Sequence, residues 1–161
     1  MSAAVTRVGV AEFAVRRAPA QLECLGLGSC VAIIVWDRAA RAGGLAHVLL
    51  PEPSTGRSGS GPARYARTAV PALLAALREA GAPGPYEASL VGGASLFGEL
   101  LKVRGVAIGA WNVEAARAAL ADAGIPVVGE DVGAAHARSV RVRLEDGRVA
   151  VRTLAHGARV L

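Results

Sequence analysis

Two apolar runs joined by a short polar segment constrain the fold of this chain more than any other feature. The first run, residues 30–36, reads Cys-Val-Ala-Ile-Ile-Val-Trp and is rich in β-branched and aromatic side chains. Residues 37–41 are polar, and a second apolar run over 42–50 ends at Pro51, which cannot continue a central strand. The sequence therefore predicts an antiparallel hairpin whose first strand is buried.

A cysteine and a histidine fall on the two strands of this predicted hairpin. Cys30 opens the first apolar run, and His47 lies in the second. With the turn centred near Ala39, Cys30 pairs with residue 47, 48 or 49. Pairing with 47 or 49 puts the two side chains on one face, with Cβ atoms about 5 to 8 Å apart, whereas pairing with 48 turns them to opposite faces. The spacing alone leaves both arrangements open.

The residues around this pair suit covalent catalysis. An adjacent imidazole lowers the pKa of a thiol and accepts its proton, so Cys30 is a candidate nucleophile and His47 a candidate general base. Gly28 and Ser29 precede the cysteine, and amide N–H groups in such a segment can stabilise an oxyanion. The alternative is structural, because a buried cysteine usually packs as a small hydrophobe and a histidine in an apolar strand usually serves packing.

Length and cysteine content limit the remaining possibilities. The 161 residues fit one domain, residues 1–161, which is large enough to form a core without crosslinks. The two cysteines, Cys24 and Cys30, are separated by a spacing that matches no usual zinc or redox motif. This spacing argues against a metal site, and we also expect no cofactor.

The charge and the hydropathy of the chain limit its possible cellular locations and binding partners. The formal net charge of +5 comes almost wholly from scattered arginines with few aromatic residues, which favours an acidic protein surface over nucleic acid as partner. No run of about 18 uncharged apolar residues is present to cross a bilayer. Residues 1–17 lack the pattern of a signal peptide, so we expect a cytoplasmic protein with reduced thiols and no membrane insertion.

Two helices and one loop are expected along the rest of the chain. Apolar residues recur at helical spacing over 65–80, where Pro71 must lie in the first turn or bend the helix. Asn112 is a suitable N-cap for a second helix that ends at Gly124. Residues 51–62 are rich in Gly, Ser and Pro, which predicts a mobile loop that either covers a substrate or only connects two elements.

The remaining segments indicate strands. An early strand is expected within residues 5–15, and others over 87–91, over 105–110 and from Val127. Residues 140–153 alternate between apolar and polar around an Asp-Gly turn, which predicts a C-terminal hairpin. Together these features predict an α+β fold with a mostly antiparallel, sandwich-like β scaffold flanked by two main helices.

A series of segments spread over the chain carries a family resemblance. The segments are residues 25–32 (LGLGSCVA), 44–51 (GLAHVLLP), 65–70 (YARTAV), 92–97 (GGASLF), 108–113 (IGAWNV), 130–133 (EDVG) and 137–140 (ARSV). In this order they closely resemble the signatures of the CheD family of chemoreceptor glutamine deamidases. The first two segments, which contain Cys30 and His47, are the most specific.

The resemblance implies an activity, a fold and partners. It implies hydrolysis of glutamine side chains on bacterial chemoreceptors to glutamate and ammonia through a thioester on Cys30, with His47 as acid and base. It implies a fold similar to that of bacterial toxin deamidases, which agrees with the hairpin register that brings the pair together. The phosphatase CheC is an implied partner. The alternative to an enzyme is a binding module for CheC or receptors that has little catalytic activity.

One departure from the family pattern concerns a third candidate catalytic residue, Cys24. The family usually has threonine or serine at this position, where it is thought to complete a triad by hydrogen bonding to the histidine. A thiol is a weaker hydrogen-bond partner than a hydroxyl group. Three interpretations follow: Cys24 completes a weakened triad with Cys30 and His47, a backbone carbonyl orients His47 instead, or Cys24 only packs in the core.

Overall fold

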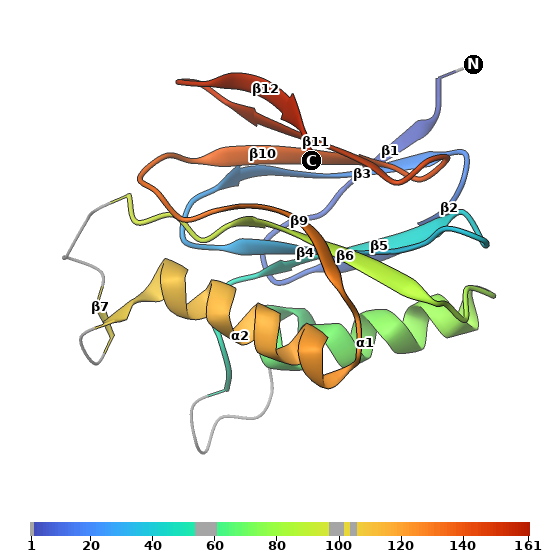
Figure 1. Cartoon of the computed structure of the whole chain (residues 1–161), viewed down its shortest axis with the longest axis horizontal. Coiled ribbons are helices and arrows are strands. Elements are labelled where there is room, and N and C mark those ends of the chain that lie inside the picture. The colour runs from blue at the N-terminus through green and yellow to red at the C-terminus, as the bar shows by residue number, and fades with distance from the viewer. Residues whose placement is uncertain (1, 54–60, 97–101, 104–105) are drawn as a thin grey trace.

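The chain folds into two stacked five-stranded sheets, with two helices packed against one of them (Figure 1). The computed structural model describes residues 2–53, 61–96, 102–103 and 106–161. The elements are β1 (Ala4–Arg7), β2 (Phe13–Arg17), β3 (Ala20–Leu27), β4 (Val31–Asp37), β5 (Ala42–Val48), η1 (Pro62–Arg64), α1 (Ala66–Glu79), β6 (Tyr86–Gly92), β7 (Lys102–Val103), β8 (Val106–Ala107), α2 (Ile108–Asp122), β9 (Val127–Val132), β10 (Arg138–Arg143), β11 (Arg148–Thr153) and β12 (Gly157–Val160).

The two sheets differ in their neighbours. The outer sheet has the order β1-β3-β10-β11-β12, and the central sheet, with the order β2-β5-β4-β6-β9, lies between the outer sheet and the helices (Figure 1). In these sheets β1 pairs with β3 and β6 with β9 in parallel, and the other pairs are antiparallel. The predicted α+β fold with a mostly antiparallel scaffold and two main helices is confirmed.

Strand β4 is buried along its whole length because both of its faces are covered. Val31, Ile33 and Val35 belong to the core cluster that includes α1 and α2. Ala32 and Ile34 point the other way, into the core between the two sheets. The strand therefore has an unbroken apolar sequence rather than the alternation of a half-exposed strand.

The predicted hairpin of β4 and β5 is confirmed, and its register is now fixed. Ala32 pairs with His47, so Cys30, two residues before Ala32, extends from the same face of the sheet as His47. This is the register in which Cys30 falls opposite Leu49 and diagonal to the histidine. The register that would separate the two side chains is wrong.

The early strand expected within residues 5–15 forms as two separate strands, because that segment contributes to both sheets. Strand β1 belongs to the outer sheet and β2 to the central sheet. Ala11, between them, has a φ of 63°, a left-handed conformation that ends an extended run. The crossing segment is hydrogen bonded to β5: Ala11 N donates to His47 O at 2.9 Å, and His47 N donates to Glu12 O at 3.0 Å.

The two helices form near the predicted positions but begin differently. Helix α1 starts at Ala66, so Pro71 lies inside it, beyond its first turn. Helix α2 starts at Ile108, and the prediction that Asn112 is its N-cap is wrong. Its first turn packs too closely for a side chain, since a Cβ on Gly109 would lie 2.5 Å from the Ala94 carbonyl oxygen. The strand expected over 105–110 is accordingly reduced to the two residues of β8.

The other secondary-structure predictions have mixed outcomes. Strand β6 covers the expected 87–91, β9 begins at Val127, and β10 and β11 form the C-terminal hairpin. Strands β3 and β12 are not among the elements that the sequence predicts. Of the loop predicted over 51–62, residues 54–60 lie outside the described residues.

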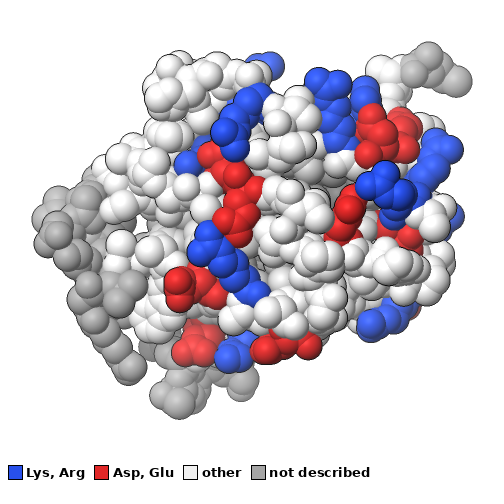
Figure 2. Space-filling view, in the orientation of Figure 1, with Lys and Arg blue, Asp and Glu red and all other residues white. Residues whose placement is uncertain are grey.

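Charges on the surface are mixed in sign. Figure 2 shows arginines next to acidic residues rather than one large basic patch on this face. Several are paired across elements, such as Arg117 with Glu130 at 2.6 Å and Arg141 with Glu23 at 2.7 Å. Within the described ranges, no helix has the length and apolar character needed to span a membrane. The same ranges contain no cluster of three or more His, Cys, Asp or Glu that could hold a metal ion.

Candidate active site

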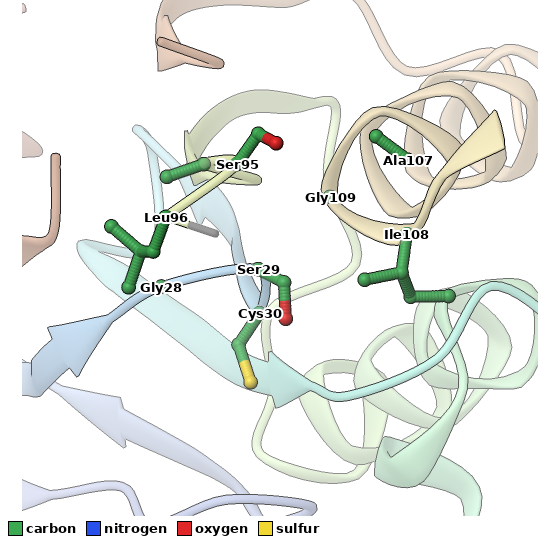
Figure 3. Close-up of a pocket in the computed structure, with 9 residues that line it drawn as sticks. Gly28, Ser29, Cys30, Ser95, Leu96, Ala107, Ile108 and Gly109 are labelled. Atoms are coloured by element: carbon green, nitrogen blue, oxygen red, sulfur yellow. The ribbon is translucent and has the colours of Figure 1, made fainter. Parts of the chain in front are cut away.

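Cys30 lies at the edge of a pocket at one end of the central sheet. The residue comes directly before β4 and is half-buried. The pocket has a volume of about 230 Å³, and Figure 3 shows residues 28–30 on one side of it and the start of α2 on another. Its lining is mostly small or apolar, and besides Cys30 it includes Ser29 and Ser95. Cys30 thus lies at the border between this pocket and the core between the two sheets, against which it packs.

The start of α2 brings backbone donors to this pocket. Ala107, Ile108 and Gly109 line it, and the helix has neither a side-chain N-cap nor an acidic residue in its first turn. The first N–H groups of a helix have no acceptor within the helix, and they carry its partial positive charge. The pocket therefore combines a thiol with groups that stabilise negative charge on oxygen.

His47 is held by the segment that crosses between the sheets. Its side chain lies in the core between the sheets, with 4% of the residue exposed. Its Nδ1 atom is 3.4 Å from the carbonyl oxygen of Val8. Because a carbonyl only accepts, Nδ1 carries the proton in this hydrogen bond, which leaves Nε2 as the basic atom. Nε2 has no hydrogen-bond partner in the part of the chain that the structure describes.

Burial keeps both members of the pair neutral at rest. Desolvation lowers the pKa of His47, and the Val8 carbonyl and the charge of Glu12 oppose this only in part. Desolvation also raises the pKa of the Cys30 thiol, although a hydrogen bond with its own backbone amide works against it. The thiol pKa is therefore raised overall, with burial as the largest cause. The arrangement suits proton transfer during attack rather than a preformed thiolate.

Cys24 occupies the same core and shares a partner with the histidine. It lies on β3, is fully buried, and its thiol donates to the Val8 carbonyl oxygen at 3.5 Å. Burial, followed by the charges of Cys30 and Glu23, raises the pKa of Cys24 to about 12, so it stays protonated. Cys24 is thus connected to His47 through the Val8 carbonyl.

Two residues of the site are not identified by the sequence patterns. The role of Val8 rests on a main-chain oxygen, which leaves no signal in the sequence. Asn112 is fully buried in α2, and its side chain contacts the segments that flank Cys30 and His47. The available signal is a polar residue inside the apolar pattern of a helix, but the same residue type is also typical of a helix cap.

Comparisons with known proteins identify the family of this chain. The family model described as "CheD chemotactic sensory transduction" matches residues 49–153, a range that begins after Cys30 and His47. The chain is 42% identical over 151 residues to the chemoreceptor glutamine deamidase CheD of Thermotoga maritima, covering 93% of this chain and 92% of that protein.

Two further relatives are similar over nearly their whole length. The probable chemoreceptor glutamine deamidase CheD of Symbiobacterium thermophilum is 41% identical, with 93% of each chain covered. The corresponding protein of Caldanaerobacter subterraneus is 35% identical, with 100% of each chain covered. On this similarity, the chain belongs to the CheD family.

Proposed function

We propose that this protein is a chemoreceptor glutamine deamidase that converts glutamine side chains to glutamate and ammonia. The names of its relatives support the reaction and the substrate class. The observation that carries the proposal is the placement of Cys30 and His47 on one face of the β4–β5 hairpin, with Cys30 at the edge of a pocket and Nε2 of the buried histidine unpaired within the described chain.

The first half of the reaction forms a thioester. Nε2 of His47 accepts the proton of the Cys30 thiol as the sulfur attacks the carbon of the glutamine amide. Negative charge develops on the amide oxygen, where the N–H of Cys30 and the first turn of α2 stabilise it. The protonated His47 then gives its proton to the amide nitrogen, the C–N bond breaks, and ammonia leaves.

The second half regenerates the enzyme. Neutral His47 takes a proton from a water molecule, whose oxygen attacks the thioester carbon. The C–S bond breaks, the Cys30 sulfur recovers its proton from His47, and glutamate is released. One water is consumed for each ammonia formed, so the thiol and the imidazole return to their starting protonation states.

The Val8 carbonyl supports both halves by orienting the base. Its oxygen holds Nδ1–H, which fixes the ring with Nε2 available and stabilises the imidazolium cation that forms during attack. Cys24 donates to the same oxygen and so acts on His47 indirectly. In this role Cys24 is a positioning residue, while Cys30 and His47 are the catalytic residues.

The cellular setting and the partners are part of the same proposal. The substrates are the cytoplasmic parts of chemoreceptors, so the protein acts in the cytoplasm, and the phosphatase CheC is a partner that docks near the pocket. The alternative function, a binding module for CheC or receptors with little catalytic activity, is not favoured, because the relatives are named as deamidases.

The test is deamidation of receptor fragments by the purified protein. Mass spectrometry should detect the amide-to-acid mass change at defined glutamines, and ammonia should appear in equal amount. Cys30→Ala should abolish both signals, whereas Cys24→Ala, which alters the only other cysteine, should leave deamidation measurable. Equal deamidation by Cys30→Ala and wild type would refute the assignment of the nucleophile.

A further inference from the structure

The two catalytic residues lie where the β4–β5 hairpin stops being a regular ladder. Strand β4 begins at Val31 and β5 ends at Val48, so Cys30 lies just outside the paired region and His47 lies one step inside its end. Beyond the ladder, two strands are free to separate. The distance between sulfur and imidazole therefore depends on what holds Ser29 and Leu49.

Asn112 holds both of these residues. Its side-chain Nδ2 donates to the Ser29 carbonyl oxygen at 2.9 Å and to the Leu49 carbonyl oxygen at 3.0 Å. The amide has two N–H groups, so each carbonyl takes one and the donor capacity is used completely. One side chain from α2 thus bridges the segment that carries Cys30 and the segment that follows His47.

The bridge is rigid because the helix that carries it is fixed. Asn112 is fully buried, and the first turn of α2 packs directly on the segment that follows β6 through Gly109. Gly93, in that segment, donates its N–H to the Cys30 carbonyl oxygen at 2.8 Å. Cys30 is therefore held between the end of β6 and the Asn112 bridge.

The acceptor end of the Asn112 amide, unlike its donor end, makes no such hydrogen bonds within the described chain. Oδ1 of Asn112 is buried and has no hydrogen-bond partner among the described residues. A buried acceptor without a partner is unfavourable, and an asparagine that served packing alone would normally have both ends satisfied. The hydrogen bonds of this side chain thus lie at its donor end, on the two strand ends that frame the catalytic pair.

We propose that Asn112 is a positioning residue that fixes Cys30 relative to His47 by bridging the carbonyls of Ser29 and Leu49. This inference rests on the proposed deamidase function for its kinetic consequence. The geometric part of the inference can be tested without that function, because the reactivity of Cys30 toward a small electrophile reports the same alignment without a receptor.

The first experiment measures alkylation of Cys30 by iodoacetamide as a function of pH. His47→Gln should slow alkylation near neutral pH, because the base is lost. Asn112→Leu, which keeps the branched arrangement of heavy atoms and removes the donors, should slow alkylation to about the rate of His47→Gln. Leu120→Ala is the matched control, since Leu120 is buried in α2 and does not line the pocket. It should lower the thermal midpoint and keep the wild-type alkylation profile.

The second experiment measures kcat and KM on receptor fragments. Asn112→Leu should lower kcat by about 100-fold, with a smaller change in KM, because a displacement of about 1 Å at the reacting atoms has that effect. Asn112→Asp gives a partial rescue that depends on pH. Its buried carboxyl group donates one hydrogen bond when protonated and repels both carbonyls when ionised, so its kcat relative to wild type should rise as the pH falls.

Each result decides the proposal. It is overturned if Asn112→Leu keeps the wild-type alkylation profile, if its losses match those of Leu120→Ala, or if His47→Gln reacts as fast as wild type. If wild type fails to deamidate receptors while Asn112→Leu still loses the His47-dependent alkylation, the proposed function fails and the positioning role stands.

Discussion

The two faces of the central sheet are both buried, but their side chains differ in chemistry. The face toward α1 and α2 is filled by aliphatic side chains, among them Ile33 and Leu73. The face toward the outer sheet is also closed, yet it contains Cys24 and His47, and Cys30 packs at its edge. Both faces come from the same strands, so one alternating pattern produces an apolar core on one side and a reactive core on the other.

The difference shows how stability and reactivity are divided in this fold. Buried polar groups are unfavourable unless they are paired, and on the reactive face the basic Nε2 atom remains unpaired within the described chain. The strand side chains on the apolar face, such as Ile33, carry no polar group and contribute to stability through burial. Substitutions of strand side chains on the reactive face should therefore change activity, and those of strand side chains on the apolar face should change the free energy of unfolding.

The largest expected effect is at the base of the reactive face. His47→Gln should lower kcat by about 10² to 10⁴-fold, because the general base is lost while an amide donor remains for the Val8 carbonyl. Ammonia release from receptor fragments measures the effect, and the thermal midpoint serves as the control for folding. A variant with wild-type kcat would break the comparison, since the reactive face would then not contain the base.

The matching substitution on the apolar face is Ile33→Ala. Ile33 is fully buried against the helices, so this change should lower the free energy of unfolding by about 2 to 5 kcal/mol through the cavity it leaves. At a temperature where the variant is folded, kcat should stay within about twofold of wild type. Urea unfolding and ammonia release test the two parts, and a large loss of kcat in folded protein would show that the faces are coupled.

The pH dependence should reveal the buried base. Because burial lowers the pKa of His47 below its ordinary value of 6.5, the base stays neutral and activity should persist below that pH. The unfolded chain binds the proton first, so stability is fully present above pH 6.5 and is lost as the pH falls from there through the folded pKa.

The pH–rate profile and unfolding midpoints across this range test both statements. His47→Gln should remove this part of the stability change. An acid limb of kcat/KM at or above the ordinary histidine pKa would contradict the lowered value.

The smallest expected effect is at Cys24. Removing its thiol in Cys24→Ala deletes one neutral hydrogen bond to the Val8 carbonyl and leaves the bond from His47, so kcat should fall by less than about tenfold. Cys24→Thr, which restores the usual family residue, should match or exceed wild type. A loss as large as that of His47→Gln would make Cys24 a full member of the catalytic group.

The sequence is sufficient to predict the hairpin but not its environment. The apolar runs around residues 37–41 define β4 and β5, yet the parity of their pairing follows from turn geometry, which spacing does not determine. The crossing of residues 8–12 between sheets depends on the left-handed Ala11, whose side chain gives no indication of it. Asn112 satisfies the rules for a helix cap, yet the helix begins at Ile108, in a turn whose close packing through Gly109 depends on the tertiary fold.

The hydrogen bond from His47 to a main-chain oxygen has a consequence for how this site can change over time. No side-chain replacement at Val8 deletes its carbonyl, so an alanine scan of the region would overlook the group that orients the base. Only an insertion, a deletion or a proline that shifts the path of the backbone would remove it. Most point mutations should therefore leave the orientation of the base unchanged, and the residue at the neighbouring position 24 can vary.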